Sequence, residues 1–283
     1  MGFGRSWSSS ENEMYRRTHV EVTCTLFWGG HSKLRMRKQM NERTRTQGHV
    51  YDPDLIWLSD PVYLDVLRRF PEAGPNATIG DRHFALFSVA KSVRNLPGDT
   101  AECGVYRGLG SFVILASVAE IPEKMHHVFD SFEGLSKPED RDHGKTHNVV
   151  ESFENLSTSS EVRDQPSQWV WREHMLAVGE DVVARNLAAF KNFRLYRGWI
   201  PFRFAEVAER RFSFVHLDVD LYRPTFDSMA FFYPRMSPGG IILCDDYGFI
   251  SCPGAKRAVD EFLADRPETV IQLTSGQGMI VKQ

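Results

Sequence analysis

Short apolar runs alternate with longer segments of helical periodicity from residue 99 to the C-terminus. Five runs have the length and composition of buried strands, at residues 100–105, 125–130, 193–198, 212–220 and 241–246. Helical patterns separate them at residues 110–121, 180–190, 225–236 and 253–265. This alternation is typical of an open, mostly parallel sheet with helices on both faces. Two final runs, 268–274 and 278–283, predict a terminal antiparallel hairpin, giving an α/β fold with seven strands.

Two regions depart from this alternation. Residues 1–50 carry nine Lys and Arg against four Glu, a net charge of +5, and show little periodicity, so we interpret them as a flexible basic extension. Residues 51–96 contain short helical patterns and predict a helical lead-in or lid before the α/β domain of residues 97–283. Within that domain, the long polar segment 134–169 predicts an inserted lid over one end of the sheet.

Acidic residues stand at the ends of successive predicted strands. Asp218 and Asp220 end the run FSFVHLDVD, where an extended strand would point both side chains to one face. Two like charges that close are unfavourable unless a proton or a cation lies between them. The next strand ends in Asp245 and Asp246. Because neighbouring strands lie about 4.8 Å apart, these acids come within reach of one ion if the two strands are adjacent.

An oxygen-only cluster favours a hard divalent cation such as Mg²⁺. We expect Asp218, Asp245 and Asp246 to be its ligands, which leaves Asp220 near the metal and free to accept a proton. The alternative is structural, since a single strand-end aspartate is commonly a helix cap or a turn residue. The recurrence of acids at successive strand ends favours the site.

The first predicted strand leads from Glu102 into a glycine-rich turn, and the second ends in Asp130. Glycines after a first strand let backbone approach a ligand, and the following acid can accept from a ribose diol. A dinucleotide is disfavoured because Val113 replaces the third glycine of the usual fingerprint and the strand-end acids would repel a pyrophosphate. S-adenosylmethionine, with its sulfonium and ammonium charges, suits such an acidic edge better.

The stretches AECGVYRG, VFDSFEGL, HLDVDLYRPT, YPRMSPGGIILCDDYG and CPGAKRAVDEF resemble the macrocin O-methyltransferase family over residues 76–282. The resemblance implies a Rossmann-like class I methyltransferase that depends on S-adenosylmethionine and a divalent metal and methylates sugar hydroxyls on natural products. It also implies a homodimer. Two departures are Leu109 between two glycines and the run GWIPFRF after the third strand. Because the predicted lid and the N-terminal extension would shape the acceptor pocket, the acceptor does not transfer from the family.

Matched by position, the resemblance gives a role to each of several residues. Metal ligation would fall to Asp218, Asp245 and Asp246, and the general base would be Asp220, with Asp218 as the second choice. The cofactor would contact Glu102, Gly104, Tyr106, Ser111, Asp130, Ser131, Phe132, Gly198 and Trp199.

Two other functions fit parts of the sequence. A DxD at a strand end also holds a metal and a nucleotide sugar in many glycosyltransferases, although the Glu102 turn and Asp130 are not expected there. A methyltransferase-like fold could also serve as a binding module without catalysis, but such a module has little use for clustered acids. In the predicted lid, His143 and His147 are alternative bases, and Phe153, Trp169 and Trp171 are candidates for stacking on a sugar.

The remaining composition bears on partners and location. The net charge of −3 gives no reason to expect nucleic acid, and no apolar run has membrane-spanning length. The four cysteines lack CxxC spacing, which favours reduced thiols in a cytoplasmic protein. We therefore expect a small-molecule or glycoside acceptor as the partner.

Overall fold

The computed structural model describes residues 55–71, 80–143 and 171–283. The predicted basic extension lies outside these ranges, as do His147, Phe153 and Trp169 of the predicted lid. Residues 55–283 belong to one unit. No helix among the described residues is both long and apolar enough to cross a membrane.

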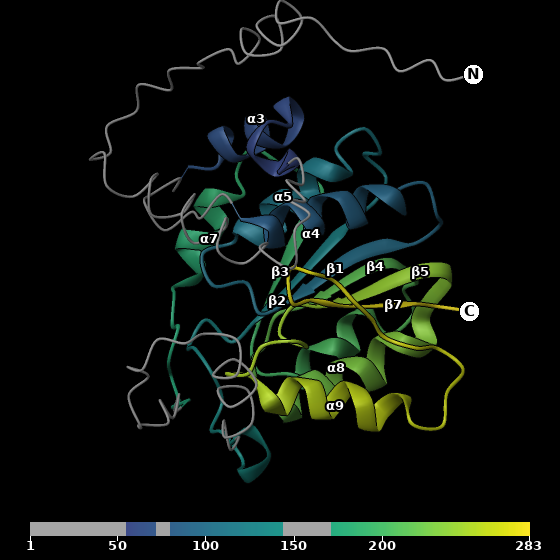
Figure 1. The fold of residues 1–283 in the computed structure, drawn as a ribbon. Coiled ribbons are helices and arrows are strands. Elements are labelled where there is room, and N and C mark those ends of the chain that lie inside the picture. The colour runs from purple at the N-terminus through teal and green to yellow at the C-terminus, as the bar shows by residue number, and fades with distance from the viewer. Residues whose placement is uncertain (1–54, 72–79, 144–170) are drawn as a thin grey trace, which may run out of the picture. The chain divides into compact units, whose positions relative to one another are not determined.

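Seven strands form one sheet in the order β3-β2-β1-β4-β5-β7-β6 (Figure 1). The first five strands in the chain pair in parallel, whereas β7 runs antiparallel to β5 and to β6. The Rossmann-like fold and the terminal hairpin predicted from the sequence are therefore confirmed. The strands are β1 (Asp99–Cys103), β2 (His126–Asp130), β3 (Phe193–Arg197), β4 (Phe212–Leu217), β5 (Met236–Cys244), β6 (Ile271–Gln272) and β7 (Gly278–Val281).

Helices cover both faces of the sheet (Figure 1). One layer contains α3 (Pro61–Arg69), α4 (Asp81–Ser92), α5 (Leu109–Ser117) and α7 (Glu180–Asn186). The other contains α8 (Tyr222–Phe232) and α9 (Pro253–Leu263). Short 3-10 turns lie at η1 (Ile56–Leu58), η2 (Asp140–Asp142), η3 (Phe202–Val207) and η4 (Tyr233–Arg235). Helix α3 begins at Pro61, because the Asp60 carboxylate accepts the Tyr63 N–H at 2.7 Å and Pro61 occupies the first turn.

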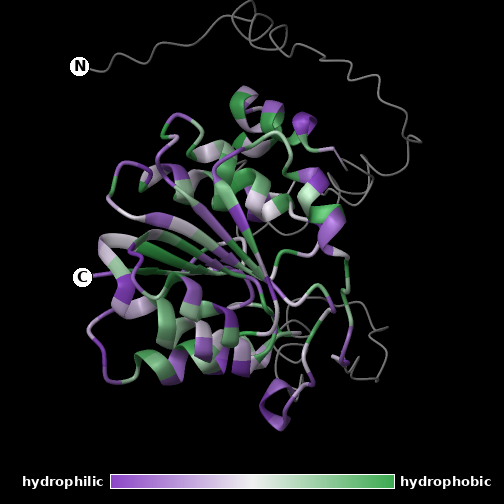
Figure 2. Cartoon of the chain, turned by 180° about the vertical axis from the view of Figure 1, so that it is seen from behind, coloured by the Kyte–Doolittle hydropathy of each residue, from purple (hydrophilic) through white to green (hydrophobic). Residues whose placement is uncertain are grey.

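Each face of the sheet has its own apolar core, and Figure 2 shows the hydrophobic strands between the helical layers. On the α8 and α9 side, Phe232 packs edge-to-face on Phe204 and Phe212, with ring centroids 5.0 and 4.9 Å apart. On the opposite side, Phe112 packs on Phe70 at 5.4 Å. Buried aromatic pairs of this kind stabilise a fold by about 0.5–1.5 kcal/mol each beyond their area. These two cores fix the strands whose ends carry the site.

The strand ends differ from the sequence expectation in one important place. Strand β4 stops at Leu217, and Asp220 takes a left-handed backbone conformation with φ of 58°. Asp218 and Asp220 therefore do not lie along one face of a continuing strand. The chain turns at this point because the Leu221 N–H donates to the Val219 carbonyl at 2.5 Å, leading directly into helix α8.

The described part of the predicted lid, residues 134–143, packs onto the domain. The Leu135 N–H donates to the Met175 carbonyl at 2.8 Å, and the Asp142 carboxylate accepts from the Tyr222 N–H at 2.6 Å. Buried Asp142 thereby caps helix α8 from outside. The rest of the predicted lid, residues 144–169, lies outside the described residues.

Gly104, between β1 and α5, gives the first testable consequence of this packing. Its φ is +76°, and a Cβ there would lie 1.9 Å from the Asp218 carbonyl oxygen. Gly104→Ala is expected to destabilise the protein well beyond the roughly 1–2 kcal/mol of a left-handed non-glycine residue. Gly239 is the matched control, because its φ is +79° but a Cβ would meet only Leu96, at 3.5 Å. Urea denaturation of both variants measures the difference, and equal losses would contradict the close approach.

Candidate functional site

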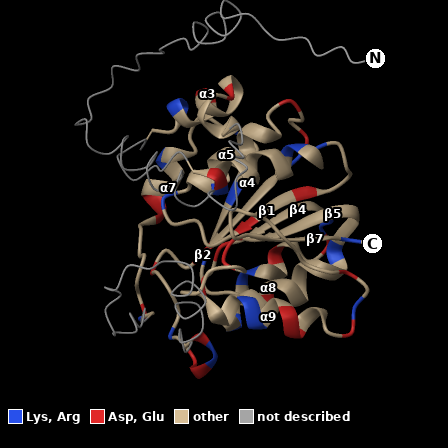
Figure 3. Ribbon diagram, in the orientation of Figure 1, with Lys and Arg blue, Asp and Glu red and all other residues tan. Residues whose placement is uncertain are grey.

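A cavity of about 700 Å³ opens beside the carboxyl ends of β1 and β4, where the strand order reverses. In doubly wound sheets this is the position at which ligands bind. Acidic segments gather at this edge of the sheet in Figure 3. Eight of the predicted site residues line the cavity: Gly104, Tyr106, Asp130, Ser131, Trp199, Asp218, Asp220 and Asp246.

The other predicted site residues are not on the cavity wall as the structure describes it. Glu102 and Ser111 are buried behind the glycine turn, where the Ser111 hydroxyl donates to the Glu102 carboxylate. Phe132 is packed in the core under α5, and its N–H donates to Asp130 at 2.7 Å. Gly198 adjoins the wall residue Trp199, and Asp245 lies buried beside Asp246.

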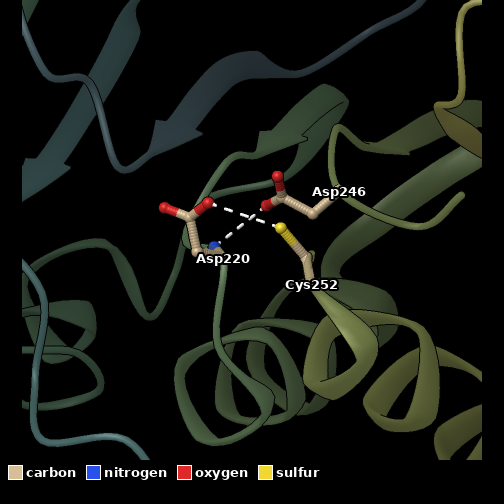
Figure 4. A group of neighbouring side chains, drawn as sticks. All are labelled: Asp220, Asp246 and Cys252. Atoms are coloured by element: carbon tan, nitrogen blue, oxygen red, sulfur yellow. Dashed lines mark hydrogen bonds between the residues drawn. The ribbon is translucent and has the colours of Figure 1, made fainter. Parts of the chain in front are cut away.

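Four aspartates converge where β4 and β5 end. Asp218, Asp245 and Asp246 each offer an oxygen within 4.8 Å of the other two, which is the set predicted for a metal. A second group joins Asp220, Asp246 and Cys252 within the same limit. Figure 4 shows Asp246 accepting the Asp220 N–H, at 2.9 Å, and the Cys252 thiol lying 3.6 Å from the Asp220 carboxylate. Asp246 therefore belongs to both groups.

Burial and mutual repulsion raise the pKa of two carboxylates in this cluster. Burial, then the neighbouring charges of Asp220 and Asp218, raise the pKa of Asp246 well above its usual range. Burial and the charge of Asp218 raise the pKa of Asp220 to about 7. A divalent cation among these oxygens would favour the ionised carboxylates and reverse both shifts. The donor set and its excess negative charge thus fit a hard cation such as Mg²⁺.

Asp245 differs from the other three acids because it is held by several protein partners. Its Oδ1 accepts from the Gln277 amide at 2.6 Å and lies 3.3 Å from His216 Nε2. Its Oδ2 forms an ion pair with the guanidinium of Arg82, which reaches in from α4 and also stacks on Phe249 at 4.6 Å. The orientation of this carboxylate is therefore fixed by the fold.

Asp130 organises the glycine turn from the end of β2. Its two carboxylate oxygens accept the N–H groups of Val105 and Phe132 at 2.8 and 2.7 Å. Burial raises its pKa despite these bonds. Each carboxylate oxygen can accept a second hydrogen bond, so Asp130 can hold the turn and still accept from a ligand hydroxyl in the cavity.

Three residues that contact the cluster have no role predicted from the sequence. His216 lies two positions before Asp218, so strand alternation could have placed the two on one face. Cys252 precedes the proline that opens α9, a position that indicates a helix start but no ligand. Arg82 carries no such signal, because only the tertiary packing of α4 brings it to β5. All three described cysteines, Cys103, Cys244 and Cys252, are free and buried, as predicted.

The described aromatic and histidine candidates of the lid separate into two cases. Trp171 lines the cavity, and its indole N–H donates to the Ser251 carbonyl at 2.6 Å. This bond anchors the ring to the segment before α9. His143 is exposed and is not part of the cavity wall.

Comparison with known sequences identifies related proteins. The family model described as Macrocin-O-methyltransferase (TylF) matches residues 68–272. The chain is 29% identical over 180 residues to the demethyldecarbamoylnovobiocin O-methyltransferase of Streptomyces niveus, covering 60% of each protein. It is 28% identical over 174 residues to the mycinamicin III 3''-O-methyltransferase of Micromonospora griseorubida, covering 59% of this chain and 61% of that one. The matches thus span about 60% of the length of these relatives.

Comparison with solved structures identifies the same fold. The O-methyltransferase NovP superposes with a TM-score of 0.55 at 25% identity, covering 75% of this chain and 84% of NovP. A calicheamicin methyltransferase superposes with a TM-score of 0.53 at 17% identity, covering 78% of this chain and 93% of that protein.

Proposed function

This chain belongs to the macrocin O-methyltransferase family, and from that premise we propose that it methylates a hydroxyl of a sugar or glycosylated natural product. S-adenosylmethionine is the proposed methyl donor, and Mg²⁺ or another divalent cation is the proposed metal. The proposal also includes a homodimer and a cytoplasmic location. The two relatives act, by their names, on novobiocin and mycinamicin intermediates, which supports this class of acceptor.

The observation that carries the proposal is the carboxylate cluster on the wall of the cavity. Asp218 and Asp246 line the same cavity as Gly104 and Asp130, so the proposed metal ligands and the proposed cofactor turn would face one space. A glycosyltransferase DxD site needs no such turn, and a binding module needs no cluster of buried acids. The volume of about 700 Å³ lies within the range of sites that enclose a drug-sized ligand.

Under this proposal each group has a defined task. Asp218, Asp245 and Asp246 would hold the metal, which when bound supplies positive charge that lowers the pKa of a coordinated acceptor hydroxyl. Asp220, on the cavity wall beside Asp246, would take the proton from that hydroxyl. Asp130 would accept from the cofactor ribose while keeping the glycine turn closed. Holding the acceptor hydroxyl in line with the methyl group of the cofactor would account for the rest of the lowering of the activation barrier, about 7–11 kcal/mol in well-oriented cases.

A binding and transfer experiment on the full chain tests the proposal. Calorimetry with S-adenosylhomocysteine and, separately, with UDP plus Mn²⁺ distinguishes a methyltransferase from a glycosyltransferase. We expect binding of S-adenosylhomocysteine and none of UDP. Radiolabelled methyl transfer to a panel of deoxysugar glycosides should then stop in EDTA and return with excess Mg²⁺, because the acceptor hydroxyl loses its activating charge without the metal.

Three outcomes would contradict parts of this proposal. Binding of UDP without S-adenosylhomocysteine would favour the glycosyltransferase. Full transfer in EDTA would exclude the metal role and leave the methyltransferase assignment intact. Absence of any shift in melting temperature with S-adenosylhomocysteine would favour a binding module.

A further inference from the structure

A buried chain of polar contacts connects the start of α5 to the carboxylate cluster. The Ser111 hydroxyl donates to one oxygen of Glu102, and the other oxygen lies 2.8 Å from His216 Nδ1. On the far side of the ring, His216 Nε2 lies 3.3 Å from Asp245 Oδ1. Glu102, His216 and Asp245 are each at most 3% exposed. None of the three is among the residues that line the cavity.

The strand register produces this alignment. Glu102 on β1 pairs with His216 on β4, and His216 pairs with Leu243 on β5. Side chains at paired positions share one face of a sheet, and so does the residue two positions further along. Asp245 stands two positions beyond Leu243, which brings its carboxylate to the same side as the His216 ring. The His216 ring thereby connects Glu102 on β1 to Asp245 at the end of β5.

Glu102 is held tightly enough to act as an anchor. A Cβ at Gly110 would lie 2.1 Å from Glu102 Oε1, so this carboxylate occupies the space that a side chain at Gly110 would need. The Ser111 hydroxyl and the His216 ring satisfy its two oxygens. A buried carboxylate with both oxygens bonded in this way has one orientation, and it fixes the ring that it contacts.

The contacts on Asp245 divide its two oxygens between different tasks. Oδ1 contacts the His216 ring and the Gln277 amide, whereas Oδ2 contacts the guanidinium of Arg82. Such outer contacts on a metal-ligating carboxylate set its orientation and alter metal affinity about 10–100-fold.

We propose that His216 is a positioning residue for the metal site: anchored by Glu102, it holds Asp245 so that Oδ2 is presented to the cation. This inference rests on the proposed metal-dependent function and extends it to a residue outside the cavity. It also gives Glu102 a task different from direct cofactor contact, since its carboxylate acts on Asp245 through the histidine ring. Glu102 and Asp245 are coupled through contiguous buried hydrogen bonds of the His216 ring, which physically connect the turn after β1 to the proposed metal ligand.

Metal affinity of the full-length protein tests the proposal without relying on turnover. The readout is free Mn²⁺ measured by electron paramagnetic resonance during titration of wild type, His216→Ala and His216→Asn. We expect His216→Ala to weaken Mn²⁺ binding about 10–100-fold. Asparagine, which retains a donor and an acceptor, should recover part of that loss. Gln277→Leu, which removes the second contact on Oδ1, should weaken binding in the same direction.

His127→Asn is the matched control. His127 is also buried on a central strand and contacts a carboxylate, with its ring nitrogens 3.0 Å from Asp99 Oδ2 and 2.8 Å from Tyr196 Oη. It has no contact with Asp245, so His127→Asn should lose stability while Mn²⁺ affinity changes less than about threefold. Circular dichroism and affinity for S-adenosylhomocysteine without metal establish that each variant is folded.

The outcomes separate this inference from the function on which it rests. If wild type binds no Mn²⁺, the proposed metal role fails. If wild type binds Mn²⁺ and folded His216→Ala binds it equally well, only the positioning role fails. If His216→Ala does not fold, the His216→Asn and Gln277→Leu variants decide. Unchanged Mn²⁺ affinity in both of them overturns the proposal.

Discussion

Asp246→Asn is expected to lower methyl transfer by at least about 10²-fold while raising the melting temperature of the metal-free protein. The activity loss follows because removing one preorganised electrostatic contact costs about 10²–10³-fold in comparable sites. Asparagine keeps the size of the side chain and an oxygen that can accept the Asp220 N–H. The substitution therefore removes the charge and leaves the geometry.

The expected gain in stability follows from the sign of the pKa shift. Burial and the charges of Asp220 and Asp218 raise the pKa of Asp246 in the folded state, so its ionisation at neutral pH opposes folding. Its contribution to stability is present at low pH, where the carboxyl is protonated, and is lost as pH rises through the folded-state pKa. The difference in melting temperature between Asp246→Asn and wild type should therefore grow from pH 5 to pH 8. Each kcal/mol of difference in the free energy of unfolding corresponds to about 2–4 °C.

Asp99→Asn is the control of opposite sign. Burial alone would raise the pKa of Asp99, but its contacts with His127 and the Met125 N–H outweigh burial and hold the pKa below its usual range. Ionised Asp99 thus supports the fold, and its asparagine variant should melt lower than wild type.

Excess Mg²⁺ should stabilise wild type and fail to stabilise Asp246→Asn. A metal-induced shift of equal size in both proteins would exclude Asp246 as a ligand.

The strand pattern predicted the fold because strand ends and helix periods are local properties of sequence. Five parallel strands, their order of appearance and the hairpin were all readable from runs such as IILCDD. The convergence of Asp218, Asp245 and Asp246 followed from the same logic, since parallel strands bring their carboxyl ends to one edge. Strand length, the alternation of strands with helices and the residues at strand ends therefore carried most of the prediction.

Contacts that depend on tertiary packing or on a single backbone angle could not be read in this way. The left-handed turn at Asp220 separates it from Asp218, and no strand pattern predicts where such a turn falls. Arg82 reaches Asp245 only because α4 packs on the same layer as α5. Glu102 was expected at the cofactor, but its register partner His216 draws the carboxylate toward β4. The contacts of Arg82 and Glu102 arise from side-chain partners on elements that are distant in sequence.

Asp220→Asn is expected to lower kcat by about 10²–10⁴-fold, the usual contribution of a general base. Mn²⁺ affinity should change less than about threefold, because Asp220 is not one of the three aspartates proposed as ligands. Cys252→Ser is the neighbouring control: it alters the contact on the Asp220 carboxylate and leaves the acid in place, so its kcat should stay within about tenfold of wild type.

The pH dependence of kcat distinguishes a base from a merely structural aspartate. The pKa of Asp220 is raised to about 7 by burial and by Asp218, and an adjacent divalent cation favours the ionised form and lowers it. In the metal-loaded enzyme, kcat should therefore rise with pH along a limb below pH 7 and then level off, and Asp220→Asn should lack this limb. If Asp220→Asn kept kcat within threefold and the limb persisted, the proton would pass to Asp218, the second candidate. Asp218→Asn would then remove the limb and weaken Mn²⁺ binding together, because one carboxylate would carry both tasks.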